Sequence, residues 1–269
     1  MTKLSTRTDV FVDRSVDNSA FSKVFAKKCA FATFFAFGEN DMIFIGKKTL
    51  LCSLAALLVT AFAFFGAATV VDAVAHSYPP LGAVVVIDAG HGGMDGGVVG
   101  VNGTSESELN LEIALLLGEI LTARGVAVVY TRTSDDALSD IKREDMNMRA
   151  EIIRDSRPDC VISIHLNSYP RDASRRGVQV FYDDTGRGGA FAALMQERLN
   201  ATVNYRYSKR TDLAPQSGDF FITKCASVPS IIIECGFLSN EQDEKLLKTQ
   251  AFRKELCKEI AETVIFAVS

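Results

Sequence analysis

The apolar positions after residue 81 alternate between short β-branched runs and longer stretches with helical spacing. Runs typical of buried strands occupy residues 83–89, 126–130, 160–166, 178–182 and 230–234, with a shorter one near 220–223. Helical spacing covers residues 106–123, 146–155, 189–203, 241–247 and 251–266. Because several of the strands are apolar on both faces, helices must cover both sides of the sheet. The pattern predicts an α/β, three-layer domain over residues 82–269, built on a mainly parallel, twisted sheet.

A different pattern fills residues 49–71, which read TLLCSLAALLVTAFAFFGAATVV without an ionisable residue. A helix of about 20 apolar residues is long enough to cross the hydrocarbon core of a bilayer. Lys47 and Lys48 precede this run and Asp72 follows it. The positive-inside bias therefore predicts one N-terminal transmembrane or signal helix, with the N-terminus in the cytoplasm and the main domain outside.

The ends of this apolar run divide the chain. Residues 73–75 read Ala-Val-Ala, a pattern that suits signal peptidase, so the domain is either membrane-anchored or secreted after cleavage behind Ala75. We expect a cytoplasmic leader at 1–48, a membrane helix at 49–71, a linker at 72–81 and the exported domain at 82–269. Residues 1–41 resemble neither a signal peptide nor a membrane anchor, whereas the run MIFIGKK from Met42 would serve as a short n-region. We therefore expect the native chain to start at Met42, without residues 1–41.

Composition narrows the class of protein. The chain is 48% hydrophobic and 23% charged, which is typical of a globular protein. Residues 82–269 carry 21 basic against 27 acidic side chains, and this acidic balance without a basic stripe argues against a nucleic-acid partner. The six cysteines form no CxxC pair, so we interpret them as small buried hydrophobes.

Polar residues end three of the predicted strands. His91 comes just after the first strand, His165 lies near the end of the middle strand, and Glu234 ends the last one. Functional residues of open α/β sheets gather beyond the carboxyl ends of the strands. An imidazole or a charge at the end of an apolar strand is costly unless it is paired or bound to a metal.

Two convergent histidines in an exported domain indicate zinc, which takes imidazole nitrogen and carboxylate oxygen and keeps one position for water in catalytic sites. A third ligand is needed, and Glu106 and Glu108 both open the helix after the first strand. A carboxylate there also suits the helix dipole. Ser105 with Glu108 would form a capping box, which leaves Glu106 free to turn toward the site. We therefore prefer Glu106, with Glu108 as the alternative.

The glycine-rich loop at 90–97 also has a nucleotide-binding interpretation. It lacks the GK[ST] ending of a P-loop and the GxGxxG spacing, because Asp95 stands where the third glycine would fall. The glycines are better explained by a tight backbone path that brings His91 to the metal.

Glu234 is the candidate catalytic base. It follows three isoleucines, and a carboxylate in such surroundings is expected to have a raised pKa. Such a group suits proton transfer from water to a leaving amine. The alternative is a structural carboxylate bonded to a neighbouring backbone group or arginine.

Four segments carry a resemblance to a known family: DAGHGG at 88–93, ESELNL at 106–111, SIHLNS at 163–168 and ECGFLSN at 234–240. In this order and spacing they resemble the zinc-dependent N-acetylmuramoyl-L-alanine amidases of the Amidase_3 family. The resemblance covers about residues 83–267. It implies that His91, Glu106 and His165 bind zinc and that Glu234 is catalytic.

The implied reaction is hydrolysis of the amide between N-acetylmuramic acid and L-alanine in peptidoglycan. Asn167, on the same strand edge as His165, is a candidate substrate contact or a plain turn residue. The short architecture with one membrane segment resembles sporulation and germination amidases that help make muramic δ-lactam in spore cortex. We expect the activity of the enzyme to be controlled by its expression, by a regulatory protein partner or by access to substrate.

Two other functions remain open on the sequence. A zinc peptidase of the carboxypeptidase type would need an arginine for a terminal carboxylate, and Arg132, Arg143 and Arg149 are available. A catalytically inactive, membrane-anchored wall-binding protein would be favoured by a missing ligand, but none of the four key positions is substituted.

Overall fold

The computed structural model describes residues 82–269. The predicted leader, membrane helix, cleavage site and linker all lie outside these residues, so they remain predictions. None of the helices within residues 82–269 combines the length and the apolarity that crossing a bilayer requires.

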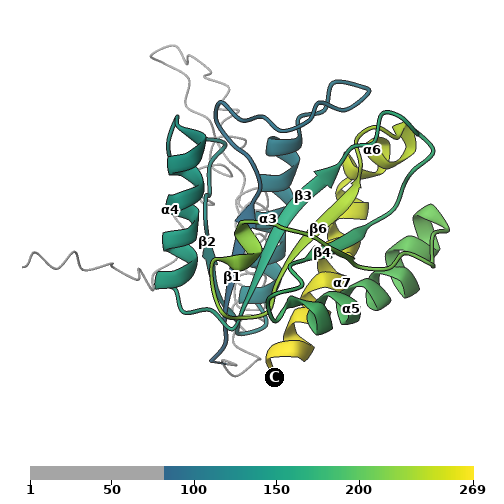
Figure 1. Cartoon of the computed structure of the whole chain (residues 1–269). Helices are drawn as coiled ribbons and strands as arrows, with labels where there is room; N and C mark the ends of the chain where they lie inside the picture. The colour runs from purple at the N-terminus through teal and green to yellow at the C-terminus, as the bar shows by residue number, and fades with distance from the viewer. Residues whose placement is uncertain (1–81) are drawn as a thin grey trace, which may run out of the picture. The chain divides into compact units, whose positions relative to one another are not determined.

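Strands and helices alternate along most of the described chain, as the hydrophobic pattern predicts (Figure 1). The strands are β1 (Val84–Ala89), β2 (Ala127–Tyr130), β3 (Cys160–Asn167), β4 (Gln179–Tyr182), β5 (Gln216–Ser217) and β6 (Ser230–Phe237). The α-helices are α3 (Glu106–Thr122), α4 (Lys142–Asp155), α5 (Gly188–Leu199), α6 (Glu241–Leu247) and α7 (Gln250–Val268). A π-helix, η1 (Asn200–Ser208), continues α5, and a 3₁₀ turn, η2 (Ile222–Lys224), precedes β6.

The strands form one sheet in the order β2-β1-β3-β6-β4-β5. All neighbouring pairs are parallel except β4 and β6, which run antiparallel. The expected mainly parallel sheet is therefore confirmed. The order places β1, β3 and β6 side by side in the middle, so their carboxyl ends meet at one edge.

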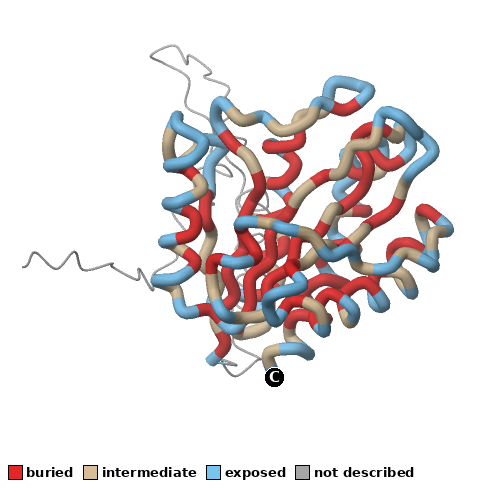
Figure 2. Tube along the Cα trace, viewed as in Figure 1, coloured by how far each residue is buried: buried red, intermediate tan, exposed pale blue. Residues whose placement is uncertain are grey.

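Helices cover both faces of this sheet, and the strand side chains divide between them with a period of two. Val85, Ile87 and Ile162 belong to the larger core, which also contains the inward residues of α3, α5 and α7. Val86 and Val161 belong to a smaller core on the opposite face, under α4 and η2. The buried residues accordingly lie along the central strands and the inner sides of the helices (Figure 2). The three-layer α/β class is confirmed.

Two local expectations differ from the structure. The prediction of a short strand near 220–223 is wrong, because this segment contains the 3₁₀ turn η2. The short strand in this part of the chain is β5, at Gln216–Ser217. The regular helix expected over 189–203 changes to a π-helix at Asn200. Asn204 there exchanges two hydrogen bonds with the backbone of Val178, just before β4, which binds the wider helical turn to the sheet.

The cysteines of the described residues are free and buried, which agrees with their interpretation as small hydrophobes.

Candidate active site

The carboxyl ends of β1, β3 and β6 bring together residues that lie far apart in the sequence. His165 on β3 stands in register with Glu234 on β6, so their side chains leave the same face of the sheet. Ala89 at the end of β1 is in register with Ile164, which places the following loop and His91 beside them. The sheet therefore gathers the predicted strand-end residues at one edge.

The glycine loop after β1 packs directly against His165. A Cβ on Gly90 would lie 2.3–2.7 Å from atoms of the His165 ring, so only glycine lets the loop pass this closely. His91 adopts the left-handed backbone conformation, with φ at 63°. A side chain other than glycine rarely takes this conformation without support from its surroundings. The tight backbone path expected from the glycines is present.

Two buried arginines supply that support. Arg132 donates hydrogen bonds to the carbonyl oxygens of Ala89 and Gly90, both at 2.9 Å. Arg149 donates to the carbonyls of Ala89 and His91 at 2.7 and 2.6 Å. Both guanidinium groups are almost fully buried and bonded to the protein, so neither faces a substrate carboxylate. The arginine that a carboxypeptidase-type site needs is therefore not supplied by these two.

Asp88 lies beneath the loop and pairs with one of these arginines. Its carboxylate accepts hydrogen bonds from Thr131 and Ser163, both at 2.6 Å, and lies 2.9 Å from Nη1 of Arg149. Burial alone would raise the pKa of Asp88, but the Arg149 charge and the two hydroxyl groups outweigh it and lower this pKa. Asp88 is therefore a charged structural anchor for the loop.

Glu106 begins α3 and points into the same site. Its Oε1 lies 3.2 Å from Nε2 of His91 and 3.2 Å from Nδ1 of His165. Its Oε2 accepts the Val98 N–H at 2.9 Å. Burial opposes ionisation, but the bonds from the two imidazoles and this N–H lower the pKa of Glu106 well below its usual range. Glu108 is exposed, so the structure distinguishes the two glutamates by position.

The expected capping box is not formed, because the Ser105 side chain makes no capping hydrogen bond and instead contacts the Ser107 hydroxyl. The Glu106 side chain is aimed by tertiary contacts. A Cβ on Gly97, whose φ is +68°, would lie 2.5 Å from Oε2 of Glu106, so this glycine makes room for the carboxylate.

The three side chains fit a zinc ion. One ligand atom each of His91, Glu106 and His165 lies within 4.8 Å of the others, and in the described part of the chain these three form the group that could hold a metal. Tetrahedral zinc with bonds of about 2.0–2.2 Å separates neighbouring donors by about 3.3–3.5 Å. The two 3.2 Å contacts around Glu106 are close to that spacing. Two imidazoles and a carboxylate are also a donor set that catalytic zinc takes.

Glu234 lies beside this group without belonging to it. Its Oε2 is buried and has no hydrogen-bond partner. Burial raises the pKa of Glu234 to about 7, a shift that the His165 imidazole opposes and the Glu106 carboxylate strengthens. The pKa of Glu234 is therefore raised, in the direction that the sequence predicts. An unpartnered carboxylate oxygen in such a place is free to exchange a proton with water or substrate.

Asn167, the candidate substrate contact, ends β3 two residues beyond His165. Its carbonyl accepts the Leu238 N–H at 2.8 Å, and its half-buried side chain makes no hydrogen bond within the described chain. Its side chain is thus available to a ligand at the edge of the sheet.

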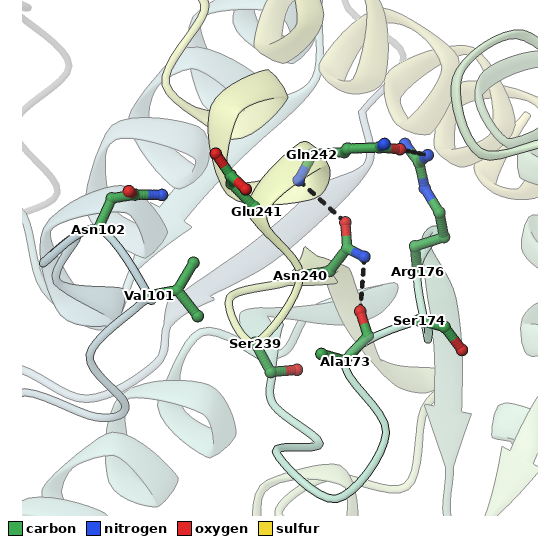
Figure 3. Close-up of a pocket in the computed structure, with 9 residues that line it drawn as sticks. All are labelled: Val101, Asn102, Ala173, Ser174, Arg176, Ser239, Asn240, Glu241 and Gln242. Atoms are coloured by element: carbon green, nitrogen blue, oxygen red, sulfur yellow. Dashed lines mark hydrogen bonds between the residues drawn. The ribbon is translucent and has the colours of Figure 1, made fainter.

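A pocket of about 710 Å³ opens among the loops that follow β3 and β6 (Figure 3). Its wall is tied together by Asn240, which donates to the Ala173 carbonyl and accepts the backbone N–H of Gln242. Three separate segments supply its lining: Val101, Asn102, Ala173, Ser174, Arg176, Ser239, Asn240, Glu241 and Gln242. Sequence reasoning missed this pocket, because its residues share no local pattern and meet only through the fold.

Comparison with known proteins gives consistent matches. The family model described as N-acetylmuramoyl-L-alanine amidase (Amidase_3) matches residues 85–265. The germination-specific N-acetylmuramoyl-L-alanine amidase of Bacillus subtilis (strain 168) is 28% identical over 197 residues, covering 70% of this chain and 81% of that protein. The amidase AmiA of Escherichia coli (strain K12) is 29% identical over 223 residues, covering 68% and 75%.

A solved structure agrees with these matches. The CwlD amidase from Clostridioides difficile, in complex with the GerS lipoprotein, superposes with a TM-score of 0.62 at 30% identity. The superposition covers 69% of this chain and 98% of that one. The similarity therefore extends over nearly the whole of the solved relative.

Proposed function

The chain belongs to the Amidase_3 family of N-acetylmuramoyl-L-alanine amidases, and from this premise we propose that it cleaves peptidoglycan with a zinc ion held by His91, Glu106 and His165. The family and its relatives make it a hydrolase of the amide between N-acetylmuramic acid and L-alanine. The observation that carries the zinc proposal is the convergence of two imidazole nitrogens on one Glu106 oxygen, each at 3.2 Å.

Glu234 is proposed as the general base and acid. When bound, zinc supplies a Lewis acid that polarises the scissile carbonyl and favours ionisation of water. The unpartnered Oε2 of Glu234 accepts a proton from the attacking water. The same carboxyl group then returns the proton to the leaving nitrogen, which departs as the amine of L-alanine while the lactyl group becomes a carboxylate. Asn167 is proposed as a substrate contact at the adjoining strand end.

A pair of glutamine variants tests this assignment. Glu234→Gln keeps the shape of the side chain but removes the proton acceptor, so turnover on purified peptidoglycan should fall by roughly 10²–10⁴. Zinc content, measured by elemental analysis, should remain at the wild-type value. Glu108→Gln, which changes an exposed carboxylate on α3, is the matched control and should keep the wild-type turnover and zinc content. A folded, zinc-free Glu234→Gln protein would make Glu234 a ligand instead of the base.

We further propose that residues 49–71 anchor the enzyme outside the cytoplasm, or export it if the chain is cut after Ala75. The support is the sequence of this segment and the lysines before it. A reporter fused to the carboxyl terminus should be active only on the outer side of the membrane. Reporter activity confined to the cytoplasm would reject both fates.

A role in spore peptidoglycan is also proposed, with muramic δ-lactam formation in the cortex as the outcome. The support is the relatives named as germination-specific and sporulation-specific amidases. The solved relative bound to a lipoprotein supports a regulatory protein partner for this chain as well. Deletion of the native gene should remove muramic δ-lactam from spore muropeptides, measured by mass spectrometry. Unchanged lactam content would limit the enzyme to other peptidoglycan.

A further inference from the structure

We propose that Asp95 is a positioning residue that fixes the His91 ring for metal binding. This inference rests on the proposed zinc site. His91 directs Nε2 toward Glu106, as described above, so its other ring nitrogen, Nδ1, faces away from the metal position. That nitrogen lies 3.0 Å from Oδ1 of Asp95. This nitrogen is buried and forms no hydrogen bond of regular geometry within the described chain, so the Asp95 oxygen at 3.0 Å is the acceptor placed beside it.

The position of the Asp95 carboxylate is itself fixed by the loop. The backbone groups of Gly92 and Asp95 exchange two hydrogen bonds, at 2.8 and 3.1 Å, which closes a four-residue turn directly after His91. Oδ1 of Asp95 also accepts the Gly97 N–H at 3.3 Å. The turn therefore holds the carboxylate against the ring four residues earlier in the chain.

A contact from α4 holds the other carboxylate oxygen. Nζ of Lys142 lies 2.9 Å from Oδ2 of Asp95. The Lys142 side chain is 73% exposed, and an ion pair with so much exposure to solvent contributes little to stability. The pair with Lys142 therefore does not explain why a carboxylate is placed beside a buried imidazole nitrogen.

A carboxylate in this place has a defined effect on a metal-binding histidine. The second ring N–H of such a histidine usually donates to a carboxylate, a carbonyl or water, which fixes the tautomer and the ring orientation. Loss of this partner typically lowers metal affinity by about 10–100-fold. With Asp95 as acceptor, Nδ1 of His91 carries the proton and Nε2 is left as the lone-pair donor toward the metal position.

The test is a zinc titration of the full chain, purified in a mild detergent and stripped of metal. Competition with a chromophoric chelator gives the zinc Kd for each variant. Asp95→Ala should raise Kd by about 10–100-fold. Asp95→Asn keeps an oxygen acceptor without the charge, so its Kd should lie between those of Asp95→Ala and the wild type.

Two controls separate this role from a structural one. Asp140→Asn removes an exposed carboxylate near the start of α4 and should leave Kd unchanged. Lys142→Ala breaks the surface ion pair and should also leave Kd near the wild-type value. Thermal unfolding of the metal-free proteins, followed by circular dichroism, should be the same for wild type and Asp95→Asn, because the effect requires the metal.

The outcomes separate this inference from the proposed function. If the wild type binds zinc and the zinc Kd of Asp95→Ala and Asp95→Asn equals that of the wild type, the inference is overturned. The proposed zinc site is then still supported. If Asp95→Ala does not fold, the Kd of Asp95→Asn decides, and a value equal to wild type rejects the role. A wild-type chain that binds no zinc overturns both the zinc proposal and the inference.

Discussion

Replacing Arg149 by Met tests whether the buried ion pair beneath the glycine loop holds the site together. The Arg149 side chain is 2% exposed. Its guanidinium lies 2.9 Å from Asp88 and 2.8 Å from Asp145 and donates to the carbonyls of Ala89 and His91. Methionine fills much of the same volume but provides none of these four contacts.

The expected loss follows from what remains after the change. Removing one partner of a buried ion pair typically costs about 3–5 kcal/mol, because the other charge stays buried without compensation. Asp88 keeps its hydrogen bonds from Thr131 and Ser163, and Asp145 keeps the Leu138 N–H. We therefore expect Arg149→Met to lower the free energy of unfolding by about 3–5 kcal/mol, and to weaken zinc binding because the His91 carbonyl loses its anchor.

Chemical denaturation of residues 76–269 measures this loss. The chain contains no tryptophan, so unfolding is followed by far-UV circular dichroism. Arg143→Met changes an exposed arginine on the same helix and should shift stability by no more than about 0.5 kcal/mol. Adding Asp88→Asn to Arg149→Met removes the stranded charge and should recover part of the loss. A loss below about 1 kcal/mol for Arg149→Met, the range of an exposed pair, would refute the reasoning.

Three further predictions concern the same site. Glu106→Ala should lose zinc while Glu108→Ala keeps it, because Glu108 is exposed; elemental analysis giving the reverse pattern would contradict the ligand assignment. The lowered pKa of Asp88 means that its contribution to stability is complete above its unfolded pKa of about 3.9 and is lost as pH falls through its folded pKa. Stability of Asp88→Asn should therefore depend less on pH in this acidic range, measured by urea titrations; equal slopes would argue against it. Gly90→Ala should displace the imidazole packed against it and weaken zinc binding, whereas Gly96→Ala, with open space around its Cβ, should not; calorimetric titration compares the two.

Much of the fold could be predicted because its signal is local. The apolar runs of β1, β3 and β6 and the periodicity of α3 are properties of short windows, and the structure places each element within a few residues of its predicted bounds. The segments that failed have weaker local signals. The π-helix after α5 depends on Asn204 bonding to the backbone near β4, and such a contact between distant segments leaves no periodic pattern.

The sequence by itself determined which residues stand at strand ends, and therefore that His91, His165 and Glu234 would meet if the strands were adjacent and parallel. Position in the helix alone only weakly separated Glu106 from Glu108, because both lie in its first turn, and the preference for Glu106 rested on a capping argument and on the family resemblance. The capping argument used for that choice is not realised, and the packing of Gly97 and Val98 against Glu106 makes the distinction instead.

Only the tertiary structure revealed what holds these residues in place. Arg132 and Arg149 looked like possible substrate contacts in the sequence, yet folding buries them under the loop as donors to its carbonyls. Asp95 looked like a departure from a nucleotide-binding loop, yet the turn places it beside His91. The physical reason is that residue type and spacing fix local conformation and burial, whereas the partner of a buried polar group is chosen by which distant segments the fold brings within about 3 Å of it.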